Sequence, residues 1–506
     1  MTTSETGGSI SQTRAAPAPP AVLRPHLPLG VVVAMACLAQ FMVVLDSSIV
    51  TLALPEMRAG LDLSASQQQW VVSGYLLTLG GFLLLAARAG DLFGRKRVFV
   101  FGAAVFTAAS LAGGLASGPA MLLAARIVQG AGAAALAPTS LSLITASHTD
   151  EHQRQRALTL WSIMGGAAGL VGVVLGGVLT AELSWRWVLF VNIPLGAGLL
   201  AAALLSLVPA PVSTERTRLD LPGAFSITLG IGALTYGLSQ ASLDGWGSVT
   251  VVTALVVAAV LLAGFVAIEA TSSRPLIPLA LFRPRGLRIG NLLMLCMGAT
   301  MTAVFYFLSL YLQQALGYSA LRAGLAVVPT TVILIAGGLA SRQLVAIVGR
   351  RLQLLTGGVI TAAGTGWLAL APAHPAYLAH ILGPALVAGV GLGLMLLPVT
   401  LAGTAGVAPR DAGAAAGLLN TSRQLGGAIG LAVLVTVAAT ATSGASGHST
   451  GLAALVHGYH VAFLAAAGVM LVAALAALAL PAATDRPMAN GRQAEVREFS
   501  DDASLG

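Results

Sequence analysis

The sequence has little charge and a single lysine. Of its 506 residues, 9% are charged and 57% are hydrophobic, whereas about a quarter of the residues in an ordinary soluble domain are charged. A soluble protein of this composition would have too few polar side chains to cover its surface. We therefore expect most of the chain to lie in a lipid bilayer, as an all-α membrane protein whose helices satisfy their own backbone hydrogen bonds.

Other scarce residues argue against several classes of protein. The two cysteines, Cys37 and Cys296, both fall in apolar segments, so we expect neither a disulfide framework nor a metal site. The net charge is +8, but the basic residues are dispersed over short segments, so we expect no nucleic-acid partner. The eight histidines are scattered and form no catalytic pattern, which argues against an enzyme.

Fourteen apolar runs are long enough to cross about 30 Å of hydrocarbon, which takes roughly 20 residues of helix. They lie near 28–54, 70–90, 97–116, 119–143, 157–181, 187–208, 221–241, 249–269, 289–316, 323–346, 353–372, 377–403, 412–440 and 458–481. An even number of spans places both termini on the same side of the membrane. Residues 1–27 and 482–506 are polar and predict disordered tails.

The distribution of arginine and lysine predicts the orientation, because short cytoplasmic loops are enriched in both. With the N-terminus in the cytoplasm, 20 of the 26 basic residues fall in cytoplasmic segments, and the outer loops hold Arg58, Arg186 and Arg322. The remaining three basic residues lie within predicted helices. We therefore expect a multi-pass protein of the cell membrane with both termini in the cytoplasm.

A weak internal repeat divides the chain. The segment ARAGDLFGRKR after the second run recurs as RQLVAIVGRRL after the tenth, so that Gly94 aligns with Gly349 and Arg95 with Arg350. Each copy follows the second helix of a six-helix block if runs 221–241 and 249–269 are an insertion. The sequence thus predicts a six-helix half at 28–208, a linker with two extra helices at 209–288, and a second six-helix half at 289–481.

Asp46, in FMVVLDSSIVTLALP, is the one acidic residue well inside a predicted span. It could be satisfied by the neighbouring hydroxyls of Ser47 and Ser48, or it could be a protonatable group, as intramembrane acids often are. Arg126 lies at a matching depth, because both residues are about 10–12 Å from the outer ends of their helices at 1.5 Å per residue. We expect an ion pair between them that protonation of Asp46 would break.

Arg423, in GLLNTSRQLGGAIG, is the other intramembrane base for which two roles remain open. It could donate to backbone carbonyl groups, or it could line a cavity. The runs from 289 onward offer no acid within reach, apart from Asp411 at a cytoplasmic edge.

Two further segments attract attention. In AGDLFGRKR, Asp91 could cap the following helix or accept hydrogen bonds from Arg95, and Gly94 permits a tight turn. In GGAAGLVGVVLGG, glycines recur at three- and four-residue spacing and make a smooth helix face, at Gly165, Gly169, Gly172, Gly176 and Gly177. That face serves either close packing alone or a hinge or seal between the halves.

Together these stretches resemble the major facilitator superfamily, and specifically its fourteen-spanning drug:proton antiporter branch. LDSSIVTLALP is similar to a signature of the first helix, and AARAGDLFGRKR to one of the loop between the second and third helices. ARIVQGAGAAALAP and GLVGVVLGG are similar to signatures of the fourth and fifth helices. Ala87 replaces a usual glycine, and Val173 replaces the usual proline after Gly172. The resemblance covers about residues 30 to 480.

The resemblance implies alternating access between two six-helix halves. It implies that Asp46 and Arg126 couple transport to protons, and that Arg88, Asp91, Gly94, Arg95 and Lys96 form a gating loop. We expect a monomer that uses no cofactor, is driven by the proton gradient, and exports small amphipathic drugs or antibiotics. The alternative is a proton-coupled importer of a small nutrient or metabolite.

The substrate itself is open. Because the second half lacks deep acids, we expect neutral, weakly basic or monocationic molecules. The expected lining residues are Tyr75, Gln129, Asn192, Tyr306, Asn420 and Arg423.

Overall fold

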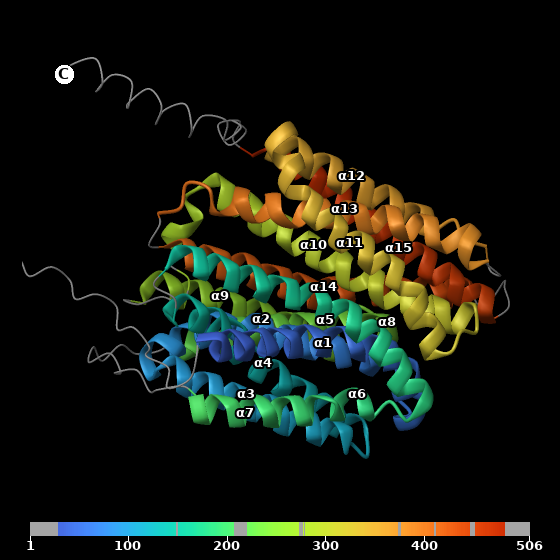
Figure 1. Cartoon of the computed structure of the whole chain (residues 1–506). Coiled ribbons are helices and arrows are strands. Elements are labelled where there is room, and N and C mark those ends of the chain that lie inside the picture. The colour runs from blue at the N-terminus through green and yellow to red at the C-terminus, as the bar shows by residue number, and fades with distance from the viewer. Residues whose placement is uncertain are drawn as a thin grey trace, which may run out of the picture.

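The computed structural model describes residues 29–147, 150–206, 220–272, 277, 279–372, 376–408, 411–445 and 451–480. Nearly all of these residues are helical (Figure 1). The helices are α1 (Leu29–Leu61), α2 (Ala65–Phe93), α3 (Arg95–Gly114), α4 (Pro119–Ser147), α5 (Glu151–Glu182), α6 (Trp187–Phe190), α7 (Asn192–Ser206), α8 (Leu221–Asp244), α9 (Val249–Thr271), η1 (Leu279–Phe282), α10 (Arg285–Leu310), η2 (Tyr311–Ala315), α11 (Ala320–Val348), α12 (Arg350–Leu368), η3 (Tyr377–Leu382), α13 (Gly383–Thr404), α14 (Ala412–Ala445) and α15 (Gly451–Ala477).

Each of the fourteen predicted spans coincides with a helical segment, which confirms an all-α membrane protein. Three spans combine two labelled elements: α6 with α7, α10 with η2, and η3 with α13. Among the described residues, thirteen helices are long and apolar enough to cross a membrane. The other span is α12, which begins with two arginines and packs between α13 and α15.

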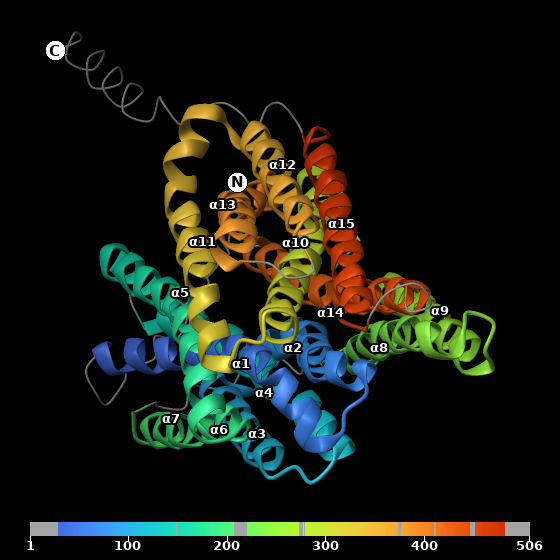
Figure 2. The same cartoon turned by 90° about the vertical axis from the view of Figure 1, so that its right-hand side faces the viewer.

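The helices form two groups with a pair beside them. Figure 2 shows α1–α7 gathered below and α10–α15 above, with α8 and α9 to one side. The helices α8 and α9 pack on each other, and α8 also contacts α2 and α14. This inserted helix therefore contacts both groups. The predicted tails at 1–27 and 482–506 lie outside the described residues, as does most of the chain between α7 and α8.

The sequence fixes several helix ends through side-chain caps. Ser64 and Gln67 form a reciprocal capping box at the start of α2, in which each side chain accepts from the other residue's backbone N–H. The side chains of Asp150, Ser248 and Ser319 accept backbone N–H groups in the first turns of α5, α9 and α11. Such caps satisfy donors that a helix leaves free at its N-terminus.

The aligned glycines of the repeat occupy matching junctions. Gly94 separates α2 from α3 with φ of +94°, and Gly349 separates α11 from α12 with φ of +80°. A backbone of this kind favours glycine because any Cβ would be strained there. Arg95 donates to the carbonyl of Ser142 on α4, and Arg350 donates to the carbonyl of Leu401 on α13. The repeat is therefore visible in the fold as two similar helix–glycine–helix turns.

The structure corrects two details of the helix boundaries. The expected loop after the second helix is a single residue, Gly94, so Arg88 and Asp91 belong to α2, and no side chain caps α3. Arg58, expected in an outer loop, lies in the last turn of α1, which extends past Pro55 to Leu61. Hydropathy marks only the apolar part of a helix, and these helices continue beyond it.

Candidate functional site

A cavity of about 1110 Å³ lies between the two groups of helices. Its walls come mainly from α1, α2, α4 and α5 on one side and from α10, α11 and α14 on the other. At one end it reaches Arg88 and the exposed Asp91 near the end of α2, together with Asp411 and Gly413 near the start of α14. The cavity is therefore accessible from the end of the molecule that carries the α2–α3 junction.

The opposite end is closed by contacts between the two groups. Ser309 donates to the carbonyl of Thr51 at 3.2 Å, and the Gln313 amide donates to the carbonyl of Leu52 at 3.2 Å. These bonds tie α10 and η2 to α1. Nearby, a Cβ on Gly324 of α11 would stand 2.7 Å from the carbonyl oxygen of Val173 on α5. Helix backbones thus touch directly at this end.

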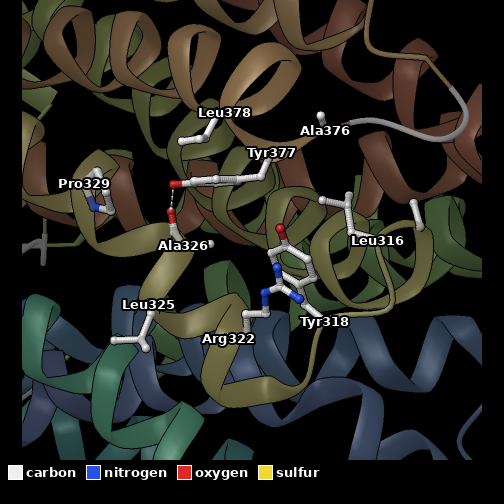
Figure 3. A pocket seen from close by; sticks show the side chains of 10 residues that line it. Leu316, Tyr318, Arg322, Leu325, Ala326, Pro329, Ala376, Tyr377 and Leu378 are labelled. Carbon is white, nitrogen blue, oxygen red and sulfur yellow. Dashed lines mark hydrogen bonds between the residues drawn. The ribbon is translucent and has the colours of Figure 1, made fainter.

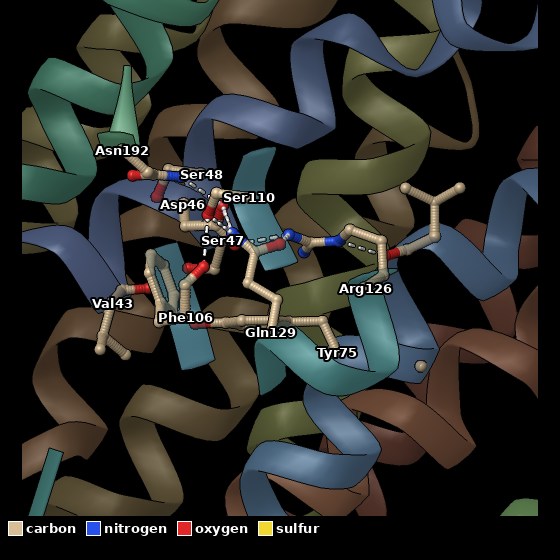
Figure 4. A network of polar contacts seen from close by, with 12 residues as sticks. Val43, Asp46, Ser47, Ser48, Tyr75, Phe106, Ser110, Arg126, Gln129 and Asn192 are labelled. Carbon is tan, nitrogen blue, oxygen red and sulfur yellow. Dashed lines mark hydrogen bonds and ion pairs between the residues drawn. The ribbon is translucent and has the colours of Figure 1, made fainter. Parts of the chain in front are cut away.

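An ion pair lies in the wall of the cavity. The Arg126 Nη1 atom of α4 is 2.6 Å from the Asp46 Oδ2 atom of α1, and both side chains are fully buried (Figure 4). The structure therefore brings together the acid and the base that matching depth had paired. Ser47 and Ser48 both donate to the carbonyl of Val44, and no bond from either to Asp46 is present among the described contacts.

Two amides complete the surroundings of the carboxylate. The Gln129 Nε2 atom lies 2.7 Å from Asp46 Oδ1, and the Asn192 Nδ2 atom of α7 lies 3.0 Å from the same oxygen. Gln129 also donates to Ser110 on α3 and accepts a bond from Arg126. Three donors therefore converge on Asp46, an arrangement that suits an ionised carboxylate, because that form only accepts hydrogen bonds.

Arg126 and Tyr75 stand between this carboxylate and the cavity. Both of them line it, whereas Asp46 does not. The Arg126 guanidinium lies 4.4 Å from the centre of the Tyr75 ring, and its Nε donates to the carbonyl of Val71 at 2.9 Å. The Tyr75 hydroxyl in turn donates to the carbonyl of Val43. The ion pair is thus adjacent to the cavity, with its acidic member behind its basic one.

Small residues of α4 allow this approach. A Cβ on Gly130 would collide with the carbonyl oxygen of Tyr75 on α2, and one on Gly132 would collide with the backbone of Phe106 on α3. These glycines let α4 pack closely against both neighbours, as membrane helices do at small residues. Arg126 and Gln129 lie just before these glycines on α4 and so reach α1, α2 and α3 at one junction.

The expected substrate-lining residues divide into two sets. Tyr75, Tyr306, Asn420 and Arg423 line the cavity. Gln129 and Asn192 do not, because their amides face Asp46 in a fully buried network. For these two residues the expected contact with the cavity is wrong in this conformation. The contact of Asn192 with the carboxylate and that of Ser110 with Gln129 had no signal in the sequence, since they depend on how α7 and α3 are rotated.

The expected gating residues cluster around the Gly94 turn. The Arg95 Nη2 atom is 3.5 Å from Asp91 Oδ1, and Lys96 donates to the carbonyl of Leu204 on α7 at 3.2 Å. Asp91 accepts from Arg95 rather than capping α3. Arg88 lines the mouth of the cavity beside it.

The five glycines of α5 face different neighbours. Gly165 and Gly169 line the cavity next to α1. Gly172 and Gly176 pack directly on the α1 backbone at Leu45 and Ile49, whereas Gly177 packs on Ala320 and Leu321 of α11. Close packing within one group and sealing between groups therefore both occur on this face. The helix runs unbroken through Val173.

A second hollow of about 850 Å³ lies at the closed end, on the flank of the second group. Figure 3 shows it between the first turns of α11 and η3. The Arg322 guanidinium stacks 4.0 Å from the Tyr318 ring, and the Tyr377 hydroxyl donates to the carbonyl of Ala326 at 2.6 Å. The two hollows have no lining residue in common, although Ala326 of this hollow and Val327 of the central cavity are neighbours on α11.

Several curated proteins similar to this chain are named for the export of an antibiotic or for resistance to one. The chain is 45% identical over 451 residues to the cephamycin export protein CmcT of Amycolatopsis lactamdurans, covering 88% of this chain and 92% of that protein. It is 39% identical to the puromycin resistance protein pur8 of Streptomyces alboniger, with 89% and 90% covered. It is 34% identical to the lincomycin resistance protein of Streptomyces lincolnensis, with 90% and 92% covered.

Solved structures share the fold at low sequence identity. A peptide transporter POT in complex with sulfate superposes with a TM-score of 0.64 at 16% identity, over 88% of this chain and 94% of that one. The nucleoside transporter NupG (D323A mutant) gives 0.62 at 15% identity, over 89% and 99%. The family model described as Major Facilitator Superfamily matches residues 36–431. The chain is therefore a multi-pass membrane transporter that belongs to the major facilitator superfamily.

Proposed function

We propose that the protein is a proton-coupled antiporter that exports small amphipathic drugs or antibiotics by alternating access. The single observation that carries the coupling is the buried Asp46–Arg126 pair in the wall of a cavity large enough for a drug-sized molecule. The curated relatives named for cephamycin export, puromycin resistance and lincomycin resistance support export as the direction.

In this proposal the structure corresponds to the inward-open state. The end with the α2–α3 junction faces the cytoplasm, in line with its basic residues, and both termini lie on that side. Substrate enters the cavity while Asp46 is ionised and paired with Arg126. Opening to the other side requires the contacts at Thr51, Leu52 and Val173 to part.

The proton acts on the pair. Protonation of Asp46 from the outside removes the negative charge that binds Arg126, so the ion pair weakens when the acid takes up a proton. Release of the proton to the cytoplasm re-forms the pair and returns the transporter to its starting state. The cycle needs no cofactor, and a single chain contains every part of it, so we expect a monomer.

Everted membrane vesicles with an acidic interior test the proposal. An exporter draws a fluorescent or radiolabelled drug into such vesicles, and each addition of drug makes the interior less acidic as protons leave in exchange. Uptake that persists after a protonophore collapses the gradient would contradict proton coupling. Movement of the compound out of the vesicles would favour the importer instead.

A further inference from the structure

Arg423 of α14 is a guanidinium in the middle of the cavity wall. It lies eleven residues into its helix, about 17 Å from the end of α14 at which the cavity opens, given a rise of 1.5 Å per residue. A Cβ on Gly298 of α10 would collide with the carbonyl oxygen of Arg423, so the α10 and α14 backbones meet closely at this point. The position of the arginine is therefore fixed by helix packing.

No acid neutralises this arginine among the described residues. Its one hydrogen-bond partner there is Asn420, whose Oδ1 accepts from Nη2 at 3.0 Å. A guanidinium has five N–H donors, so most of its hydrogen-bonding capacity is not used by the described residues, and its side chain lines the cavity. A charged side chain at membrane depth is costly and pairs with an opposite charge wherever one is present.

The other charged side chains of the cavity differ from Arg423, because they either have a charged partner or lie at the mouth. Arg126 is paired with Asp46. The two aspartates among the described lining residues, Asp91 and Asp411, lie at the mouth near the ends of their helices. The middle of the cavity thus carries one positive charge that no described acid balances, in a wall that also includes the apolar side chains of Met301, Phe305 and Leu334.

We propose that Arg423 recognises an anionic group, so that the cavity takes amphipathic substrates that carry a carboxylate. This inference rests on the proposed export function and specifies its substrate class. A carboxylate accepts two parallel N–H bonds from a guanidinium, which adds direction as well as charge. The apolar wall holds the body of the molecule, while the hydrogen bond to Asn420 orients the arginine.

This substrate class differs from the one that the sequence predicted. Neutral to monocationic substrates were expected because residues 289–481 hold no deep acid. The same absence, once Arg423 is placed in the cavity wall, leaves an unbalanced positive charge, which attracts anions and repels cations. The arginine was open between two roles in the sequence, and its position in the cavity wall favours the binding role.

Matched pairs of compounds test the inference. The probes are benzylpenicillin and fusidic acid, each as the free carboxylate and as its neutral carboxamide, with ethidium as the cation. Proton-driven initial rates are measured in everted vesicles containing the full chain, for wild type, Arg423→Gln and Arg423→Lys. Arg342→Gln is the matched control, because Arg342 is an exposed arginine of α11 that does not line the cavity.

We expect wild type to have a lower KM for a carboxylate than for its carboxamide. Arg423→Gln raises the KM for the carboxylate by about tenfold or more, as loss of a hydrogen-bonded charge does. Its KM for the carboxamide stays near the wild-type value, which also shows that the variant is folded. The KM of Arg423→Lys for the carboxylate falls between those of wild type and Arg423→Gln, because lysine keeps the charge but cannot donate two parallel N–H bonds. Arg342→Gln behaves as wild type.

Two outcomes would overturn the inference alone: proton-driven transport of ethidium or the carboxamides without transport of the carboxylates, or a carboxylate preference that survives in Arg423→Gln. A purely structural role for Arg423 would lower the rates for the carboxylates and carboxamides together, and such a joint loss would also contradict the inference. Absence of proton-driven transport for every probe would instead contradict the proposed function.

Discussion

Gly177 of α5 lies directly against Ala320 of α11, so close that a Cβ on the glycine would be 2.7 Å from the Ala320 carbonyl oxygen. The two helices belong to different groups, and they meet at the end where the cavity is closed. Gly172 and Gly176, which precede it on the same helix, touch α1 of their own group instead. A single glycine-rich face therefore carries both a contact within one group and a contact between the groups, and the second is the one that parts in the proposed alternating-access cycle.

Gly177→Val should weaken the closed end selectively. The added side chain must displace the α11 backbone, and overpacking of this kind costs about 1–3 kcal/mol. We expect a lower initial rate of proton-driven transport with normal amounts of protein in the membrane. Gly198→Val on α7 is the control, since nothing lies within 4 Å of a Cβ at that glycine. Equal rates in Gly177→Val and wild type would show that this contact does not limit the cycle.

Asp91→Asn should reduce transport while leaving the protein in the membrane. The Asp91 side chain is 67% exposed and 3.5 Å from Arg95, and an exposed ion pair contributes little to stability, about 0–1 kcal/mol. Its loss therefore should not unfold the protein, but it removes a charge from the mouth of the cavity. Transport rate and membrane abundance are measured together. Asp244 is an exposed acid at the end of α8, and Asp244→Asn should leave the transport rate and the membrane abundance unchanged. Full transport by Asp91→Asn would exclude a gating role.

Asn192→Ala should impair coupling partially. The substitution removes one of three donors to Asp46, and an unsatisfied buried acceptor costs about 1–3 kcal/mol. We expect the rate of proton-driven transport by Asn192→Ala to be lower than that of wild type and higher than that of Asp46→Asn. Ser110→Ala should have a smaller effect, because Ser110 contacts Gln129 and not the carboxylate. A larger loss in Ser110→Ala than in Asn192→Ala would contradict this order.

The spans and the central pair could be predicted because both follow from one-dimensional quantities. Hydropathy locates each helix, and a constant rise per residue places Asp46 and Arg126 at the same depth. The turn at Gly94 and its repeat at Gly349 were also visible, because a tight turn between two helices requires a residue that tolerates positive φ.

The surroundings of the carboxylate could not be predicted from the same quantities. Gln129 and Asn192 face Asp46 rather than the cavity because of how α4 and α7 are rotated about their axes. Rotation depends on packing against neighbours, such as Gly130 against Tyr75, which involves residues far apart in the chain. For the same reason the sequence left Arg423 open between a structural role and the cavity wall.

The pair Asp46 and Arg126 carries the central claim of proton coupling. Asp46→Asn removes the group that would take the proton and leaves Arg126 without its counter-charge. Arg126→Ala leaves a buried carboxylate with two amide donors and no ion-pair partner. Residues that act as one unit show non-additive effects, so the double variant should lose little more than either single variant.

The most direct measurement is proton-driven drug uptake into everted vesicles for Asp46→Asn, Arg126→Ala and the double variant at equal protein amounts. Coupling through the pair predicts that Asp46→Asn abolishes uptake against a gradient, although downhill exchange of the drug can remain, and that the three losses are nearly equal. Full gradient-driven uptake by Asp46→Asn would contradict the account.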